Sequence, residues 1–125
     1  MNIPDNLLYT NEHEWVVIEG EVATVGITDY AQGELGDIVY VDLPKLDATT
    51  KQMQPFGTIE AVKTVSDLYA PLSGKIVEVN TKLAEQPELI NQDCYRAGWL
   101  VKIKISAKDE VQSLLTPKDY QVLVG

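Results

Sequence analysis

The sequence contains few of the residues from which catalytic and metal sites are usually built. Its 125 residues include one histidine, His13, and one cysteine, Cys94. Two such side chains cannot complete a zinc site, which needs about four nitrogen or sulfur ligands, and a lone cysteine cannot form an internal disulfide. These shortages argue against a stand-alone enzyme. They leave a Cys94–His13 dyad as the one nucleophile–base pair to weigh.

Positive charge is also scarce. Lysine and arginine total 10 against 19 acidic residues, and the net charge is −9. This balance disfavours nucleic acid and anionic membranes as partners and suits docking onto basic patches of other proteins. No apolar run approaches the roughly 18 residues of a membrane span, and residues 1–6 resemble neither a secretory signal nor a transit peptide. We therefore expect a bacterial cytoplasmic protein, or a mitochondrial matrix protein if the chain is a processed one.

Strand patterns dominate what the sequence does contain. Residues 15–18 and 22–25 are rich in β-branched residues and flank a turn at 19–21. Residues 38–43 form a further strand pattern that Pro44 ends, and residues 45–54 read as a polar loop. In the last strand pattern, Trp99, Val101, Ile103 and Ile105 share one face, while Lys102 and Lys104 point to the other. The chain length suits one domain over residues 1–125, with a mainly β core at about 15–105.

Two of these strand patterns recur in order. Residues 36–42 resemble residues 74–80, with glycine, isoleucine and two valines identical, and residues 57–62 align more weakly with residues 98–103. Two matches in the same order indicate two quasi-equivalent β halves, although valine-rich strands also match by chance. Lys63 lies at the junction between the halves.

Helix signals are confined to short segments. Thr28 is placed to cap a short helix that ends at Gly33 or Gly36. C-terminal helices are expected at about 107–124. Ser106 is a weak cap candidate for the first, and Thr116 followed by Pro117 is a cap signal for the second.

Lys63 lies in the most informative stretch of the chain, residues 57–74. Val62 and Thr64 flank it and favour extended backbone. A hairpin turn at this point would lift the lysine amine off the sheet and expose it. An amide bond to a cofactor would then remove the charge and leave a mobile apolar arm. The pattern indicates a covalent carrier lysine, and a solvated surface charge is the ordinary alternative.

The chain resembles the glycine cleavage system H protein family in motifs that run through nearly its whole length. They are Tyr9–Trp15, Gly26–Gln32, Leu35–Val39, Asp42–Pro44, Glu60–Asp67, Tyr69–Gly74 and Gly98–Ile103. The resemblance implies a barrel-sandwich hybrid fold of the lipoyl/biotinyl type with short N-terminal and C-terminal helices. It also implies lipoate in amide linkage to Lys63, and no metal.

The resemblance further implies a role in glycine catabolism and one-carbon metabolism. The loaded arm would take an aminomethyl group from a pyridoxal-phosphate glycine decarboxylase to a tetrahydrofolate-dependent aminomethyltransferase, and dihydrolipoamide dehydrogenase would reoxidise it. A lipoate ligase or octanoyltransferase would load the lysine. Glu60 and Gly74 match positions that lipoylating enzymes need. Glu14 and Asp67, with Glu12 nearby, match carboxylates that shelter the aminomethyl arm.

Other uses of this lysine stay open at this point. A biotin carrier usually has methionine on both sides of the lysine, and a 2-oxoacid dehydrogenase lipoyl domain usually heads a longer chain. A lipoate relay, which passes lipoyl groups to other 2-oxoacid dehydrogenase complexes, is the main alternative. The chain departs from the family pattern in residues 44–54 and in residues 91–97, where Cys94 replaces a usual proline. Both segments are expected to lie away from the lysine turn.

Overall fold

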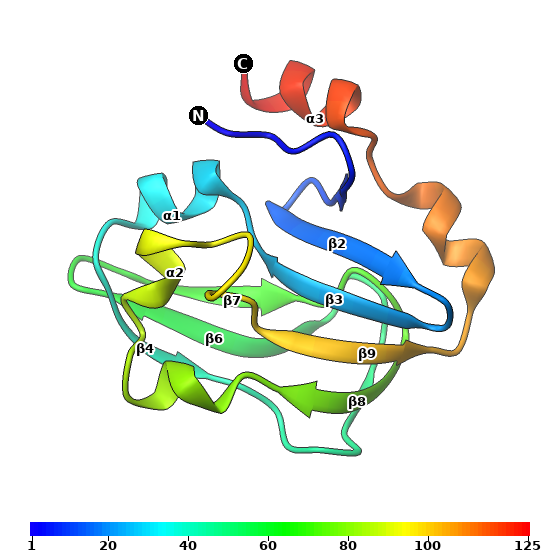
Figure 1. The fold of residues 1–125 in the computed structure, drawn as a ribbon, viewed down its shortest axis with the longest axis horizontal. Coiled ribbons are helices and arrows are strands. Elements are labelled where there is room, and N and C mark those ends of the chain that lie inside the picture. Colours follow the sequence, from blue (N-terminus) through cyan, green and yellow to red (C-terminus); the bar gives the residue numbers. More distant parts are fainter.

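Antiparallel strands form two sheets of unequal size (Figure 1). The computed structural model describes residues 1–125. Its strands are β1 (Leu8–Tyr9), β2 (Glu14–Glu19), β3 (Val22–Ile27), β4 (Ile38–Asp42), β5 (Thr49–Thr50), β6 (Pro55–Ala61), β7 (Val65–Tyr69), β8 (Gly74–Val79) and β9 (Val101–Ile105). The larger sheet has the order β1-β2-β3-β9-β8-β5 and the smaller β4-β6-β7. The predicted mainly β fold is confirmed, but the predicted loop at 45–54 contains β5, which pairs with β8.

Short helices lie around the sheets (Figure 1). They are α1 (Asp29–Leu35), η1 (Thr81–Ala84), α2 (Leu89–Gln92), η2 (Lys108–Ser113) and α3 (Pro117–Val124). The predicted caps of α1 and α3 are confirmed, because Thr28 accepts from the amide of Ala31 and Thr116 from that of Asp119. The predicted Ser106 cap is wrong, since Ala107 precedes η2 and no side chain caps it. No helix is long and apolar enough to cross a bilayer.

The two halves predicted from the repeat share a detailed pairing pattern. Ile38 opposes Ala61 between β4 and β6, and Ile76 opposes Ile103 between β8 and β9. In each pair the register then shifts by one residue, so that a β-bulge falls at Val39 in one half and at the equivalent Val77 in the other. This shared irregularity supports two quasi-equivalent halves.

The second part of the predicted repeat is one residue out of register. Aligning residues 57–62 with 98–103 makes Lys102 the equivalent of Ala61. In the structure, the equivalent of Ala61 is Ile103, because each opposes the corresponding isoleucine of its partner strand. A one-residue slip exchanges the two faces of a strand, and both Ala61 and Ile103 are buried. The glycine at 98 misled the alignment because β9 begins only at Val101.

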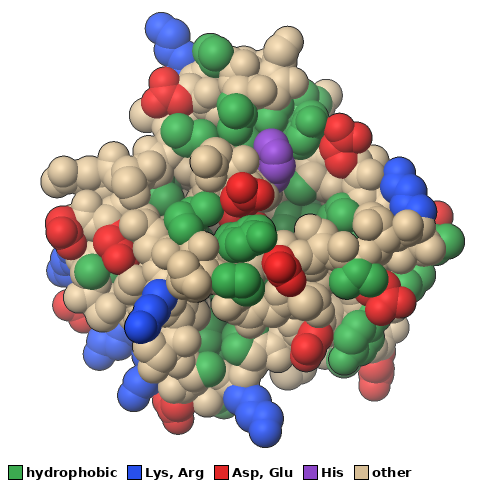
Figure 2. All heavy atoms as spheres, turned by 180° about the vertical axis from the view of Figure 1, so that it is seen from behind, with side chains coloured by type: hydrophobic (Ala, Val, Ile, Leu, Met, Phe, Trp, Pro, Cys, Tyr) green, Lys and Arg blue, Asp and Glu red, His purple; other side chains and the backbone are tan.

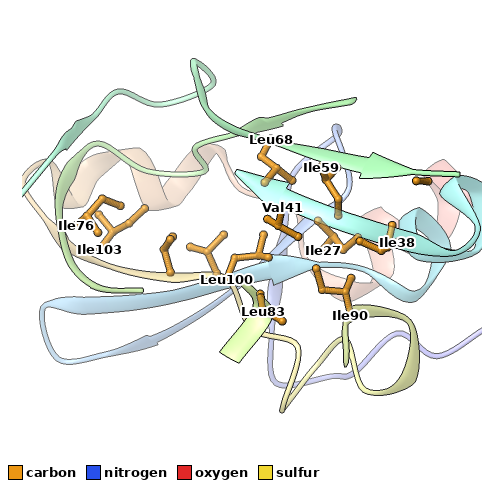
Figure 3. Packing of buried hydrophobic residues seen from close by; sticks show 13 residues of the cluster. Ile27, Ile38, Val41, Ile59, Leu68, Ile76, Leu83, Ile90, Leu100 and Ile103 are labelled. Carbon is orange, nitrogen blue, oxygen red and sulfur yellow. The ribbon is translucent and has the colours of Figure 1, made fainter. Parts of the chain in front are cut away.

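The main core fills the space between the two sheets. Thirteen buried apolar residues form it, including Ile76 and Ile103 toward one end and Ile38, Ile59 and Ile90 toward the other (Figure 3). Each fully buried aliphatic side chain contributes about 1.5–3 kcal/mol of transfer free energy. This core therefore fixes which faces of β4, β6 and β7 point inward, and leaves their outer faces free.

A smaller aromatic cluster fastens the C-terminal helix to the start of the chain. The rings of Tyr9 and Tyr120 stack with centroids 4.6 Å apart, and Leu115 forms an isolated bridge with Tyr9. The indole nitrogen of Trp15 donates to the carbonyl of Cys94 at 3.0 Å. These contacts hold α3 against β1 and so fix the turn between β1 and β2, where part of the site lies.

Candidate functional site

Lys63 lies at the tip of the turn between β6 and β7. The amide of Ala61 donates to the carbonyl of Thr64 at 2.8 Å and closes the turn. Residues 62–67 are all exposed, and Val62 retains 76% of its accessible surface. The predicted exposure of the lysine is confirmed.

A groove of about 170 Å³ opens close to this turn. It lies between the edge strand β7, the turn before β2, and α1. Its lining combines apolar and acidic side chains: Glu12, His13, Glu14, Ile27, Tyr30, Ala31, Glu34, Leu35, Ser66, Asp67, Leu68 and Tyr69. Figure 2 shows the face opposite to that of Figure 1, on which the histidine and several acidic side chains lie among hydrophobic ones. The groove is smaller than pockets for drug-sized ligands, which hold about 300–1,000 Å³, and it suits a slender chain.

Glu14 is the deepest polar group of the groove. Only 2% of its surface is exposed, and burial raises the pKa of its carboxyl from 4.5 to about 8. Oε1 accepts a 2.6 Å hydrogen bond from the Thr10 hydroxyl, and Oε2 accepts from the amide of Tyr69 at 3.3 Å. Hydrogen bonds to a carboxylate lower its pKa, so here desolvation outweighs them. Glu14 therefore holds a proton at neutral pH.

The two other predicted acids lie at the mouth of the groove. Glu12 and Asp67 both line it and are exposed. Asp67 is on β7, whose far edge has no strand partner. The Tyr69 amide points outward from this edge and donates to Glu14. Backbone groups two residues apart on a strand point in the same direction, so those of Asp67 also point outward from the edge. The structure thus brings together all three acids that the resemblance placed around the arm.

Comparison with known proteins identifies the family. Residues 7–124 match the family described as Glycine cleavage H-protein. The chain belongs to the glycine cleavage H-protein family.

Individual relatives agree with this family along almost the whole chain. The glycine cleavage system H proteins of Bacillus mycoides (strain KBAB4) and Bacillus cereus (strain B4264) are each 54% identical over 120 residues, covering 96% of this chain and 94% of theirs. A crystal structure of a glycine cleavage system H protein from Mycobacterium marinum superimposes with a TM-score of 0.89 at 43% identity, covering 96% of this chain and 97% of that one. The fold is thus that of an H protein, consistent with the predicted barrel-sandwich hybrid.

Family membership makes the chain a lipoyl-carrier component of the glycine cleavage system. The matched family and relatives name glycine cleavage, and they do not favour the alternative of a lipoate relay. The structure contains no group of three or more side chains that could hold a metal ion.

Two further residues that the resemblance singled out lie outside the groove. Glu60 is exposed on β6, opposite Tyr40 and Val65 on the outer face of the small sheet. Gly74 begins β8 in the larger sheet and is buried. A Cβ at this position would lie 2.1 Å from the carbonyl oxygen of Lys104. Close packing of β8 on β9 therefore explains this glycine by itself, and its role in recognition stays a prediction.

The sequence did not predict that His13 lines the groove. Its backbone has φ 74°, and its ring packs against Tyr30 with centroids 4.7 Å apart. Nδ1 lies 2.9 Å from the hydroxyl of Tyr120, which lies 2.7 Å from the hydroxyl of Thr28. Burial lowers the pKa of His13, so the imidazole is neutral at pH 7. The motif Tyr9–Trp15 contained this histidine, but only the fold shows that Tyr120 of α3 contacts it.

The Cys94–His13 dyad finds no support. Cys94 is 6% exposed, and burial raises the pKa of its thiol to about 12. The side-chain partner of the His13 ring is Tyr120. A nucleophilic thiol needs a base and a lowered pKa, and Cys94 has neither.

Proposed function

We propose that Lys63 carries lipoate in an amide bond and that the loaded arm shuttles the aminomethyl group of glycine. The arm would collect this group at a pyridoxal-phosphate glycine decarboxylase and deliver it to a tetrahydrofolate-dependent aminomethyltransferase. Dihydrolipoamide dehydrogenase would reoxidise it. The bound dithiolane supplies the redox and group-transfer chemistry, and the chain itself is a carrier and not an enzyme.

One observation carries this proposal: an exposed lysine amine lies beside a narrow groove that ends in a buried acid. The residues present fit a lipoyl group. The amine is on a tight, exposed turn, and the groove offers apolar walls along its length and carboxylates for a charged end. A biotin carrier has no use for the buried Glu14, because biotin has no ammonium group to pair with it.

Glu14 is suited to keep the cargo protonated. An aminomethyl thioether loses its cargo when the lone pair of the nitrogen expels the sulfur, and a protonated nitrogen has no free lone pair. The Glu14 carboxyl holds a proton at neutral pH and would give it to an arriving amine, which leaves a carboxylate facing an ammonium. At about 4 Å and an effective dielectric near 20, this pair is worth roughly 4 kcal/mol before desolvation, and burial cancels a large part.

The acidic surface suits partners with basic docking patches. The net charge of −9 would steer the carrier toward such patches and speed encounter. The same negative charge would favour docking of the loading enzyme, a lipoate ligase or octanoyltransferase. The relatives come from Bacillus and Mycobacterium, which supports the bacterial cytoplasm over the mitochondrial matrix.

Intact-mass spectrometry of the natively expressed chain tests this proposal. We expect one lipoyl adduct, localised to Lys63 by peptide mapping, whose occupancy rises when lipoate is supplied. A biotinyl mass at Lys63, or an unmodified lysine in cells that lipoylate their other carriers, would overturn the proposal.

A further inference from the structure

The side chain of Lys63 lies across a glycine. If position 36 carried a Cβ, that atom would be 3.4 Å from Cε of Lys63 and 3.7 Å from Nζ. Gly36 follows α1 and has φ 81° and ψ −154°, a backbone conformation in which glycine is strongly favoured. The lysine stem thus passes over a point where the chain has no side chain.

The backbone of the lysine turn is tied to the same segment. The amide of Val62 donates to the carbonyl of Asp37 at 3.1 Å. Asn91 of α2 in turn holds this segment, because its Nδ2 donates to the Gly36 carbonyl at 2.8 Å and its Oδ1 accepts from the amide of Ile38 at 2.9 Å. The lysine stem and the lysine turn therefore both contact residues 36–38, a segment that Asn91 holds in place through two hydrogen bonds. The expectation that residues 91–97 lie away from the lysine turn is wrong for Asn91.

The segment 36–38 also adjoins the groove. Glu34 and Leu35, which immediately precede Gly36, line one wall, and Ser66 and Asp67, which follow the lysine turn, line the other. An arm that leaves Lys63 toward Glu14 starts at the end of the groove marked by Gly36. Figure 1 shows the turn between β6 and β7 beside the connection from α1 to β4.

We propose that Gly36, held by Asn91, is a positioning residue that lets the lysyl stem lie low enough for the arm to enter the groove. This inference rests on the proposed function, since it concerns the same lysine. A Cβ at position 36 would just touch the end of the Lys63 side chain, and atoms beyond Cβ would meet the stem and lift it away from α1. The arm would still be attached, but it would seat in the groove for less of the time.

The decisive variant is Gly36→Asn, whose side chain extends beyond Cβ into the path of the stem; it also strains the backbone, because φ 81° with ψ −154° is a conformation essentially restricted to glycine. Gly20→Asn is the control for a side chain at a positive-φ glycine in open space: Gly20 has φ 65° and nothing lies within 4 Å of its Cβ position. Asn91→Ala is a second variant that adds no atoms and loosens the Gly36 carbonyl. All variants are compared at a temperature at which circular dichroism shows them to be folded.

Two measurements on lipoylated, aminomethyl-loaded protein follow seating of the arm. The first is the half-life of the cargo, and the second is the change that loading causes in the methyl NMR signals of Ala31, Leu35 and Leu68, which line the groove. We expect Gly36→Asn to shorten the half-life about fivefold or more and to lose the loading shifts. Asn91→Ala should change both in the same direction, and Gly20→Asn should match the unmodified sequence.

Half-lives and NMR shifts in Gly36→Asn and Asn91→Ala that equal those of Gly20→Asn would overturn the role of Gly36. The proposed function fails separately, if the unmodified sequence never gains a lipoyl group or never retains cargo. The extent of lipoylation, measured by mass before loading, separates a defect in attachment from a defect in seating.

Discussion

The hydroxyl of Thr10 donates a 2.6 Å hydrogen bond to Oε1 of Glu14 and accepts one from the Glu14 amide at 3.1 Å. This double contact fixes the glutamate in one orientation, with the Tyr69 amide on its other oxygen. Both oxygens of the carboxyl therefore accept hydrogen bonds, which lower its pKa. The pKa is raised nevertheless, because burial has the larger effect. A group of this kind makes stability depend on pH.

We predict that Glu14 makes the chain less stable as the pH rises from about 5 to 8. The folded state keeps the proton up to a pKa of about 8, whereas the unfolded chain loses it near 4.5. Between these values the folded state binds more protons, so the free energy of unfolding falls by up to about 1.4 kcal/mol per pH unit. Glu14→Gln removes this titration, so its stability relative to the unmodified sequence should rise over the same range. Urea unfolding at several pH values measures the difference, and a difference that stays flat would contradict the burial argument.

The acids of the groove are predicted to protect the cargo unequally. Glu14→Gln should shorten the half-life of the loaded form more than Asp67→Asn, because Glu14 is buried and Asp67 is exposed at the mouth. Losses within about five- to 150-fold correspond to a docking preference of 1–3 kcal/mol. Release of formaldehyde and ammonia into solution measures the decay. Asp42→Asn is the control, since Asp42 is an exposed acid in the same cross-strand row as Asp67, outside the groove; equal decay in all three variants would remove the protective role.

Lys63→Ala is predicted to abolish both the lipoyl adduct and glycine–bicarbonate exchange without harming the fold. The side chain is exposed, and surface substitutions usually change stability by less than about 0.5 kcal/mol. Lys45→Ala, at another exposed lysine, should keep adduct and exchange. Mass spectrometry, the exchange assay and thermal unfolding are run together on both variants. Exchange that persists in Lys63→Ala would show that another group carries the cargo.

The sequence predicted those features of the fold that depend on neighbours along the chain. β-branched runs and the alternating pattern before residue 105 identified β2, β3, β4 and β9, and Thr28 and Thr116 identified the helix starts. The β-branched neighbours of Lys63 favoured extended backbone, but residues 62–64 lie in the turn between β6 and β7. The register of β9 was missed because Gly98, the apparent start signal, lies three residues before the strand begins. Local patterns thus indicate that a strand exists more reliably than where it begins.

The contacts that shape the site could not be read in this way, because they join distant segments. Nothing near Asn91 in the sequence points to Gly36, yet the fold places the amide on that carbonyl. The resemblance suggested Glu14 as a shelter, but its burial results from the edge of β7 lying against it. The Asn91–Gly36 contact and the burial of Glu14 both result from tertiary packing, and residue spacing does not predict either of them.

Cys94 is predicted to be inert in the folded chain. Burial raises the pKa of its thiol to about 12, and the thiolate is the reactive form. Iodoacetamide at pH 8 should leave it unlabelled in the native protein and label it in urea. Cys94→Ala should leave glycine turnover unchanged, and rapid native labelling or lost turnover would revive a role for the thiol.

Gly74→Ala is predicted to destabilise the fold through a clash between sheet strands. The new methyl would lie 2.1 Å from the Lys104 carbonyl oxygen and 2.7 Å from Cγ2 of Ile103, and neither backbone nor buried side chain can yield without separating β8 from β9. Overpacking of this kind costs about 1–3 kcal/mol or more, measurable by urea unfolding. Gly33→Ala is the control, because nothing lies within 4 Å of its Cβ position. If Gly74→Ala is lipoylated normally at a temperature where it is folded, packing accounts for the glycine; if it is folded but poorly lipoylated, Gly74 also takes part in recognition.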